Sequence, residues 1–172
     1  RSENGRLLAA YDIVMDENGC LASYKQIKKG EQPKGRVWYA YLERATPSPW
    51  YNNQTYVNTL DKAAMDRFIE ITYETYKNKV GEDFGETAPS IFTDEPQFSH
   101  KSTFCFPEDV RDITLPWTED LTETFAEAYG EDLIAGLPEL FWEKPNGEVS
   151  TVRYHYHDHI TERFTQAFAD NC

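Results

Sequence analysis

The sequence predicts an α/β fold in which an antiparallel β meander precedes β–α units, and two observations carry this prediction. Three strand-like runs stand before the first helix-like run. A long amphipathic stretch over residues 62–79 then leads to a short apolar run, residues 90–93, as in a β–α–β unit whose crossover is a helix. We therefore divide the chain into a meander over residues 1–45 and β–α units over residues 46–172.

The meander is read from alternating apolar residues and one turn. Apolar residues alternate along residues 8–15 and 20–27, and Asp16-Glu17-Asn18-Gly19 forms the turn between these two strands. Asn-Gly favours a tight hairpin because both residues tolerate positive φ. A polar connector over residues 30–35 leads to a third strand over residues 36–42. Three strands before any helix do not fit a plain βα repeat, so we expect an insertion or a small accessory sheet.

Helices are expected over four later stretches. Asp61 is a good N-cap for the first, residues 62–79, which carries an inward apolar stripe and ends at Gly81. The second runs from a Thr118 cap to Gly130, and the third is short, over residues 132–141. After a turn at Pro145-Asn146-Gly147, the last helix runs from residue 151 or 152 to the end of the chain.

Asp94, Glu95 and Pro96 directly follow the apolar run over residues 90–93. We expect an interior parallel strand, with Pro96 ending the ladder and holding Glu95 extended. Acidic side chains at the carboxyl end of a parallel strand are typical of α/β active sites. The structural alternative is that Asp94 caps the next turn and Glu95 is solvated, and the residues alone leave both readings open.

Several motifs resemble those of one enzyme family. They are Tyr-Val-Asn-x-Leu at 56–60, Phe-Gly at 84–85, Phe-Thr-Asp-Glu-Pro at 92–96 and Leu-Pro-Trp-Thr at 115–118. In this order they resemble the α-L-rhamnosidase-like group of bacterial glycoside hydrolases, over about residues 56–140. The resemblance implies a partial (β/α)8 (TIM) barrel whose strand end at residues 94–95 faces the sugar. Asn58 departs from the group's pattern, which favours an acid there.

The chain is long enough for only part of such a barrel. A complete (β/α)8 barrel needs about 200 residues at the least, and this chain has 172. We therefore expect an internal segment of a larger enzyme, with the remainder of the parent polypeptide as its partner. Such a segment is expected to be inactive in isolation.

Charge and cysteine usage exclude other classes. A formal net charge of −13 disfavours nucleic acid and anionic membranes as partners, because both are polyanionic. No apolar run approaches the length of about 20 residues that spans a bilayer. Three widely spaced cysteines, Cys20, Cys105 and Cys172, indicate reduced thiols and favour a cytoplasmic parent.

Carboxylate chemistry is therefore the reaction that the sequence predicts. Glycoside hydrolysis commonly uses one protonated and one ionised carboxyl group. Glu95 is the candidate general acid because its longer arm reaches furthest from the strand end. Asp94 is expected to orient it or to bind a sugar hydroxyl, and the second catalytic carboxylate is expected outside the chain. The alternative function is a non-catalytic carbohydrate-binding or scaffold segment.

The candidate sugar-binding residues lie in loops. They are Asn58, which stands in the resembling motif, Trp50 in the loop over residues 46–53, and His100 and Trp117 on the long loop over residues 97–117. Aromatic rings such as those of Trp50 and Trp117 stack on the C–H faces of sugars, although most aromatic residues fill cores.

Metal and cofactor sites are not expected. His155 and His159 have ligand spacing on a helix while His157 points away, but the Glu of an H-E-x-x-H motif is missing and a third ligand would have to come from elsewhere. The sequence contains no G-x-S-x-G, G-x-G-x-x-G or P-loop motif, so acyl-transfer and nucleotide chemistry have no support.

Overall fold

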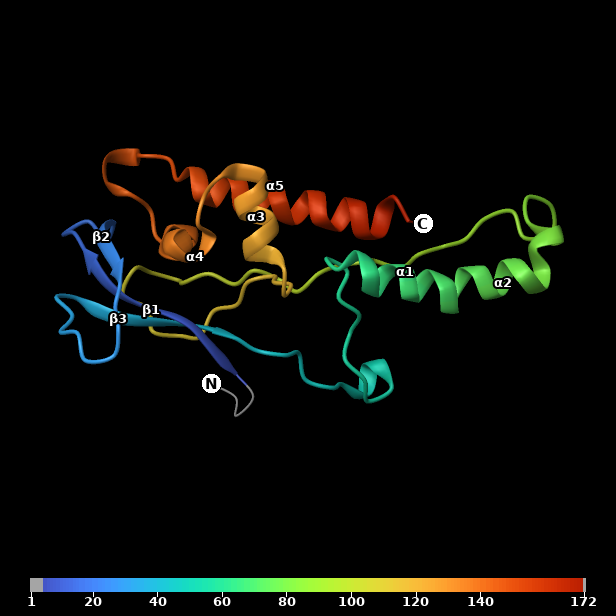
Figure 1. The fold of residues 1–172 in the computed structure, drawn as a ribbon, viewed down its shortest axis with the longest axis horizontal. Coiled ribbons are helices and arrows are strands. Elements are labelled where there is room, and N and C mark those ends of the chain that lie inside the picture. Colours follow the sequence, from blue (N-terminus) through green and yellow to red (C-terminus); the bar gives the residue numbers. More distant parts are fainter. Residues whose placement is uncertain (1–4, 172) are drawn as a thin grey trace.

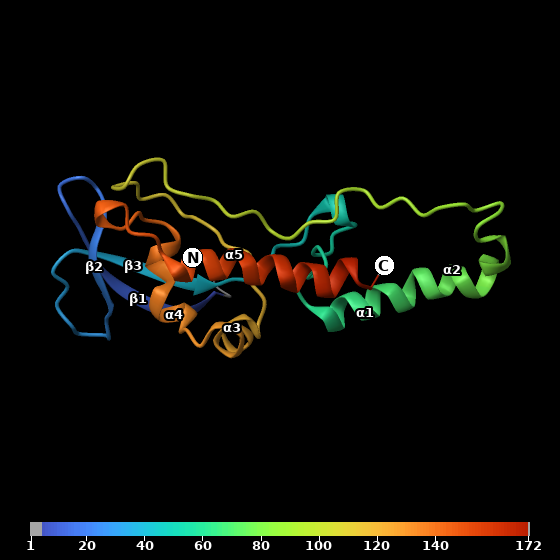
Figure 2. The ribbon, with the colours of Figure 1, turned by 90° about the horizontal axis from the view of Figure 1, so that it is seen from above.

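The computed structural model describes residues 5–171, and it consists of a packed body and a projecting arm. The body contains a β-sheet and the C-terminal helices, and the arm carries two consecutive helices and a long extended return (Figures 1 and 2). Most of the buried apolar residues belong to the body.

The sheet has three antiparallel strands in the order β2-β1-β3. They are β1 (Arg6–Met15), β2 (Leu21–Gln26) and β3 (Arg36–Leu42), so the three predicted strands are confirmed within one or two residues. The β1–β2 turn forms because Asp16 Oδ1 accepts hydrogen bonds from the backbone N–H groups of Asn18 (2.9 Å) and Cys20 (2.8 Å). Gly19 takes the positive φ of 76° that this turn requires.

Helices cover one face of this sheet. They are α3 (Leu121–Tyr129), α4 (Leu133–Gly136) and α5 (Thr151–Phe164), with 3₁₀ turns at Leu137–Leu140 and Pro145–Gly147 and a π-helical turn at Thr165–Ala169. Tyr11 and Ile13 of β1 are fully buried against them, and the Tyr11 hydroxyl donates to the Ile134 carbonyl (2.5 Å). The meander therefore shares its core with the C-terminal helices.

The C-terminal helices largely follow the sequence prediction. Gly130 ends α3 in the left-handed region, and α5 begins at Thr151 behind a Ser150 cap. The start of α3 was predicted wrongly. The helix begins at Leu121 with Asp120 at its N-cap, and the Thr118 hydroxyl accepts a hydrogen bond from Asn58 instead of capping the helix.

The arm begins with the 3₁₀ turn Pro49–Tyr51 and then α1 (Lys62–Ile71) and α2 (Tyr73–Val80), which a 3₁₀ turn at Gly81–Asp83 follows. Asp61 caps α1 as predicted, accepting from the N–H groups of Ala63 and Ala64. The predicted single helix is interrupted at Thr72, whose hydroxyl donates to the Phe68 carbonyl (2.6 Å). Such bonding of a Thr hydroxyl to the fourth preceding carbonyl often bends helices.

The prediction of a partial (β/α)8 barrel is wrong. The described sheet is small and antiparallel, and it shows no eight-stranded barrel pattern. Residues 90–93 form no strand, so they are not the predicted interior parallel strand and α1 and α2 are not its crossover. The run is extended, but Pro89 and Pro96 lack N–H groups on either side of it, and no described strand lies beside it to complete a ladder.

Candidate functional site

The two adjacent carboxylates lie on the return limb of the arm. Residues 89–98 run back from the tip of α2 toward the body (Figures 1 and 2), and Asp94 and Glu95 are exposed there. Within the described part of the chain, the backbone groups of residues 90–95 form no hydrogen bond. A contact of 3.4 Å between the Tyr73 and Thr93 hydroxyls joins this limb to α2. Both carboxylates are thus presented to solvent.

Glu95 has an unusual backbone conformation. Its φ is +43°, in the left-handed region, so the expectation of an extended Glu95 is wrong. Few residues other than glycine adopt positive φ, because Cβ crowds the backbone, and the residue before a proline is normally extended. Strained backbone of this kind gathers at functional sites, where it is part of the mechanism. The strain singles out Glu95 among the acidic residues that the structure describes.

Asn58 lies at the base of the arm, with both ends of its side-chain amide engaged. Its Nδ2 donates to Thr118 Oγ1 (3.0 Å), and its Oδ1 accepts from the Leu60 N–H (3.2 Å). The neighbouring Thr59 hydroxyl donates to the Gln97 carbonyl (2.8 Å). Asn58 therefore holds the start of the arm against the body.

The remaining three candidates lie apart from one another. Trp50 stands on the 3₁₀ turn Pro49–Tyr51 with 87 % of its surface exposed. His100 is exposed, and its carbonyl accepts from the Thr114 hydroxyl (3.2 Å). Trp117 is half-buried against the body's core. The structure does not gather the predicted site residues into one cleft.

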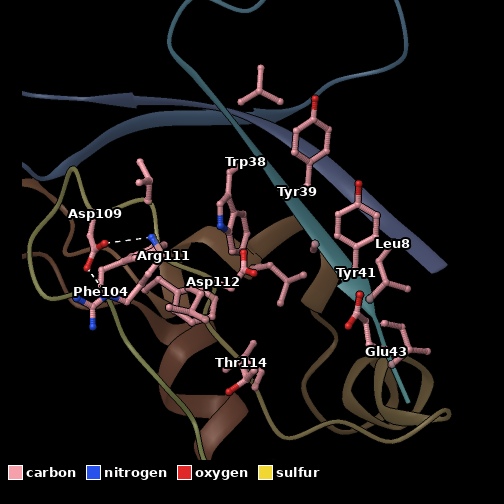
Figure 3. A pocket seen from close by; sticks show the side chains of 18 of the residues that line it. Leu8, Trp38, Tyr39, Tyr41, Glu43, Phe104, Asp109, Arg111, Asp112 and Thr114 are labelled. Carbon is pink, nitrogen blue, oxygen red and sulfur yellow. Dashed lines mark hydrogen bonds and ion pairs between the residues drawn. The ribbon is translucent and has the colours of Figure 1, made fainter. Parts of the chain in front are cut away.

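A cavity of about 470 Å³ opens along β3 on the body. One wall is the run of consecutive residues from Arg36 to Glu43, and the opposite wall is residues 109–115 (Figure 3). Of the six predicted site residues, Trp117 alone lines it. The aromatic residues Trp38, Tyr39 and Tyr41 belong to the strand wall, and none of them was among the predicted site residues. The two-residue spacing of Tyr39 and Tyr41, which places both on one face of the strand, is the feature of the sequence that could have indicated them.

The wall opposite β3 is held by one buried carboxylate. Asp109 accepts from the N–H groups of Cys105 (3.0 Å) and Arg111 (3.1 Å), and its Oδ2 lies 2.6 Å from Arg111 Nε. The Cys105 N–H and then the Arg111 contacts lower the pKa of Asp109 despite its burial. The Arg36 guanidinium donates to the Asp109 and Pro107 carbonyls. This wall is therefore tied to β3 at the Arg36 end of the cavity.

The histidines of α5 serve packing. His155 stacks on Tyr129 with ring centroids 4.4 Å apart and meets Glu131 at 2.9 Å, whereas His159 Nε2 lies 2.9 Å from Thr124 Oγ1. Residues 5–171 contain no group of three or more His, Cys, Asp or Glu side chains placed to hold a metal ion. Burial, with the charge of Arg163, lowers the pKa of His159.

Comparison with protein-family models, with curated proteins and with solved structures gives no match for this chain. Across the described residues, none of the helices has both the length and the apolar character needed to cross a bilayer.

Proposed function

We propose that this chain acts on carbohydrate as part of a glycoside hydrolase, with Glu95 as general acid and Asp94 as its assisting carboxylate. The observation that carries the proposal is the left-handed backbone of Glu95, which lies between an exposed aspartate and a proline. Glu95 is exposed, as the structural alternative expected, but positive φ at a residue that can transfer a proton supports a functional role.

The division of roles follows from side-chain length and placement. Glu95 has the longer arm and donates its proton to the leaving oxygen, while Asp94 orients it or binds a sugar hydroxyl. A general acid must hold its proton near neutral pH, which requires burial against further protein surface. Both carboxylates are exposed in the described structure, so covering surface and a second catalytic carboxylate must come from elsewhere in the enzyme. The chain alone is therefore expected to turn over no aryl glycoside.

Comparing substrates with different leaving groups tests the proposal in the enzyme that contains this chain. General acid catalysis is worth about 10²–10⁴ in rate. Glu95→Gln should therefore slow hydrolysis of a poor leaving group by at least about a hundredfold, and an activated aryl glycoside much less. Asp94→Asn serves as the matched variant and should lack this leaving-group dependence. Equal losses on both substrates for Glu95→Gln, or a rate close to wild type, would remove Glu95 as the acid.

An exposed aromatic cluster favours non-catalytic carbohydrate binding as the second candidate. Trp50 lies next to Tyr51, whose ring centroid is 5.1 Å from that of Tyr56, and all three rings reach solvent. Flat exposed rings of this kind stack on sugar faces. Trp50→Ala should abolish retention on an immobilised neutral polysaccharide, whereas Tyr154→Ala, an exposed aromatic residue on α5, should not. Unchanged retention for Trp50→Ala would refute this candidate.

A further inference from the structure

Lys101 is a half-buried amine that has no carboxylate partner. It lies on the long loop over residues 97–117, and its Nζ donates to the Leu140 carbonyl (2.9 Å) and lies 3.3 Å from His157 Nε2 of α5. None of the described carboxylates forms an ion pair with it. A charged group that is taken out of water normally has such a partner, because the loss of hydration is costly. Lys101 therefore differs from an ion-paired structural lysine.

The hydrogen-bond partners of Lys101 fit a neutral amine. A lysine ammonium has three N–H donors, whereas the neutral amine has two donors and one lone pair. The Leu140 carbonyl accepts one N–H group, and His157 Nε2 accepts the other in the tautomer that carries the imidazole proton on Nδ1. No other described residue accepts a hydrogen bond from Nζ. The neutral form satisfies both of its donors and leaves the lone pair free to react.

The charges around Lys101 act in the same direction overall. Burial is the largest effect and lowers the pKa of Lys101, and the neighbouring Arg153 guanidinium lowers it further. Glu143 acts in the opposite direction, but its carboxylate is paired with Arg153 (2.6 Å). The Phe141 ring, whose centroid lies 5.7 Å from Nζ, also favours the ammonium. Burial, with the charges of Lys101 and Arg153, lowers the pKa of His157 as well, so this imidazole can accept a proton at neutral pH.

We propose that Lys101 is a covalent binding site for small aldehydes, which it takes as a Schiff base while His157 moves the proton. Lysines that are desolvated or lie beside another cationic group are the amines that proteins use in this way. The proposal rests on the cluster around Lys101 and not on the proposed function.

The reaction balances without any further reagent. The Nζ lone pair forms a bond to the carbonyl carbon, and the π electrons of the C=O bond move to its oxygen. His157 Nε2, which already contacts Nζ, accepts a proton from the nitrogen and passes it to that oxygen. The carbon–oxygen bond then breaks and the C=N bond forms. Both amine protons end on the departing oxygen, so amine and aldehyde give imine and one water.

The cluster favours an uncharged aldehyde over an anionic one. The Arg153 guanidinium is the other cation beside Lys101, and it already donates to the carbonyls of Glu139 (2.7 Å) and Trp142 (2.6 Å) and to the Glu143 carboxylate (2.6 Å). It therefore offers no open fork to a carboxylate or phosphate. The aldehyde approaches from the side of His157, which is exposed.

Reductive trapping with propionaldehyde and sodium cyanoborohydride at pH 7 tests the proposal on the whole chain. Cyanoborohydride supplies hydride to the imine and leaves a stable N-propyl lysine, which peptide mass spectrometry locates. Lys144 is the matched control, because it is also half-buried but pairs with Glu148, which raises its pKa. Lys29 is the exposed control. Lys101 should be labelled at least about tenfold faster than either.

Two further measurements separate the cluster from simple exposure of the amine. In urea the cluster is lost, so Lys101 should be labelled no faster than Lys29. His157→Gln keeps a hydrogen-bond acceptor but cannot take up the proton, so labelling of Lys101 should fall at least about tenfold while that of Lys29 and Lys144 stays unchanged. Faster labelling of Lys144 in this variant would mean that its fold is lost, and the native and urea rates of the wild-type chain then decide.

The proposal is overturned if Lys101 in the native chain is labelled no faster than Lys29 or Lys144. It is also overturned if Lys101 keeps its advantage in urea, because its reactivity would then come from neighbouring residues in the sequence. An unchanged rate at Lys101 in folded His157→Gln would remove His157 as the group that moves the proton.

Discussion

Arg163 joins the arm to the body, and its removal should cost about 2–4 kcal/mol of unfolding free energy. Its guanidinium donates to the Leu60 carbonyl through Nε (3.1 Å) and Nη2 (2.9 Å), and to both carboxylate oxygens of Asp120 at 2.9 Å. Leu60 is almost completely buried, so Arg163→Ala leaves its carbonyl without these donors, at about 1–3 kcal/mol. The ion pair adds about 1 kcal/mol, since the Asp120 side chain is 47 % exposed.

Urea unfolding monitored by tryptophan fluorescence measures this loss. In thermal unfolding, the melting temperature of a chain of this size should fall by about 2–4 °C for each kcal/mol of unfolding free energy that is lost. Arg67→Ala is the control, because Arg67 forms an exposed helical pair with Glu70 and its loss should change stability by no more than about 0.5 kcal/mol. Equal effects of the two substitutions would refute the assignment of Arg163 as a residue that joins the arm to the body.

Two further predictions concern the body. The pKa of His159 is lowered by burial and by Arg163, so the unfolded chain binds a proton more readily than the folded chain does, and stability should fall as pH drops below the unfolded value of about 6.5. His159→Gln should reduce the difference in unfolding free energy between pH 7.5 and pH 5.5, and an unchanged difference would exclude His159 as its source. A Cβ on Gly35 would lie 2.0 Å from the Ile13 carbonyl oxygen, so Gly35→Ala should destabilise the chain by at least about 2 kcal/mol. Gly30→Ala, which meets nothing within 4 Å but has a φ of +93°, should cost only about 1–2 kcal/mol, and a smaller loss for Gly35→Ala than for Gly30→Ala would contradict the crowding argument.

Local signals in the sequence predicted the elements that depend on neighbouring residues. The Asn18-Gly19 turn, the Asp61 cap and the Gly130 stop each act within a few residues, and the structure contains all three. The break at Thr72 also has a local cause, the bond from its hydroxyl to the Phe68 carbonyl, but the sequence prediction took residues 62–79 as one helix. The bounds of the three strands followed from the same kind of evidence.

The fold class could not be predicted in this way, because strand pairing is a long-range property. Residues 90–93 have a strand's composition, but whether a ladder forms depends on a neighbour far away in the chain. The cavity depends in the same way on residues 36–43 meeting residues 109–115, which no spacing reveals. The positive φ of Glu95 could not be predicted either, because the residue before a proline is normally extended.

Amide hydrogen exchange at residues 90–95 tests the central structural claim, that this run forms no ladder within the described chain. In dilute protein these amides should exchange nearly as fast as in an unfolded peptide, because no described residue accepts their hydrogen bonds, while β1 amides such as that of Ile13 should be strongly protected. Protection of this run in dilute protein as strong as that of β1 would show a paired strand and contradict the account.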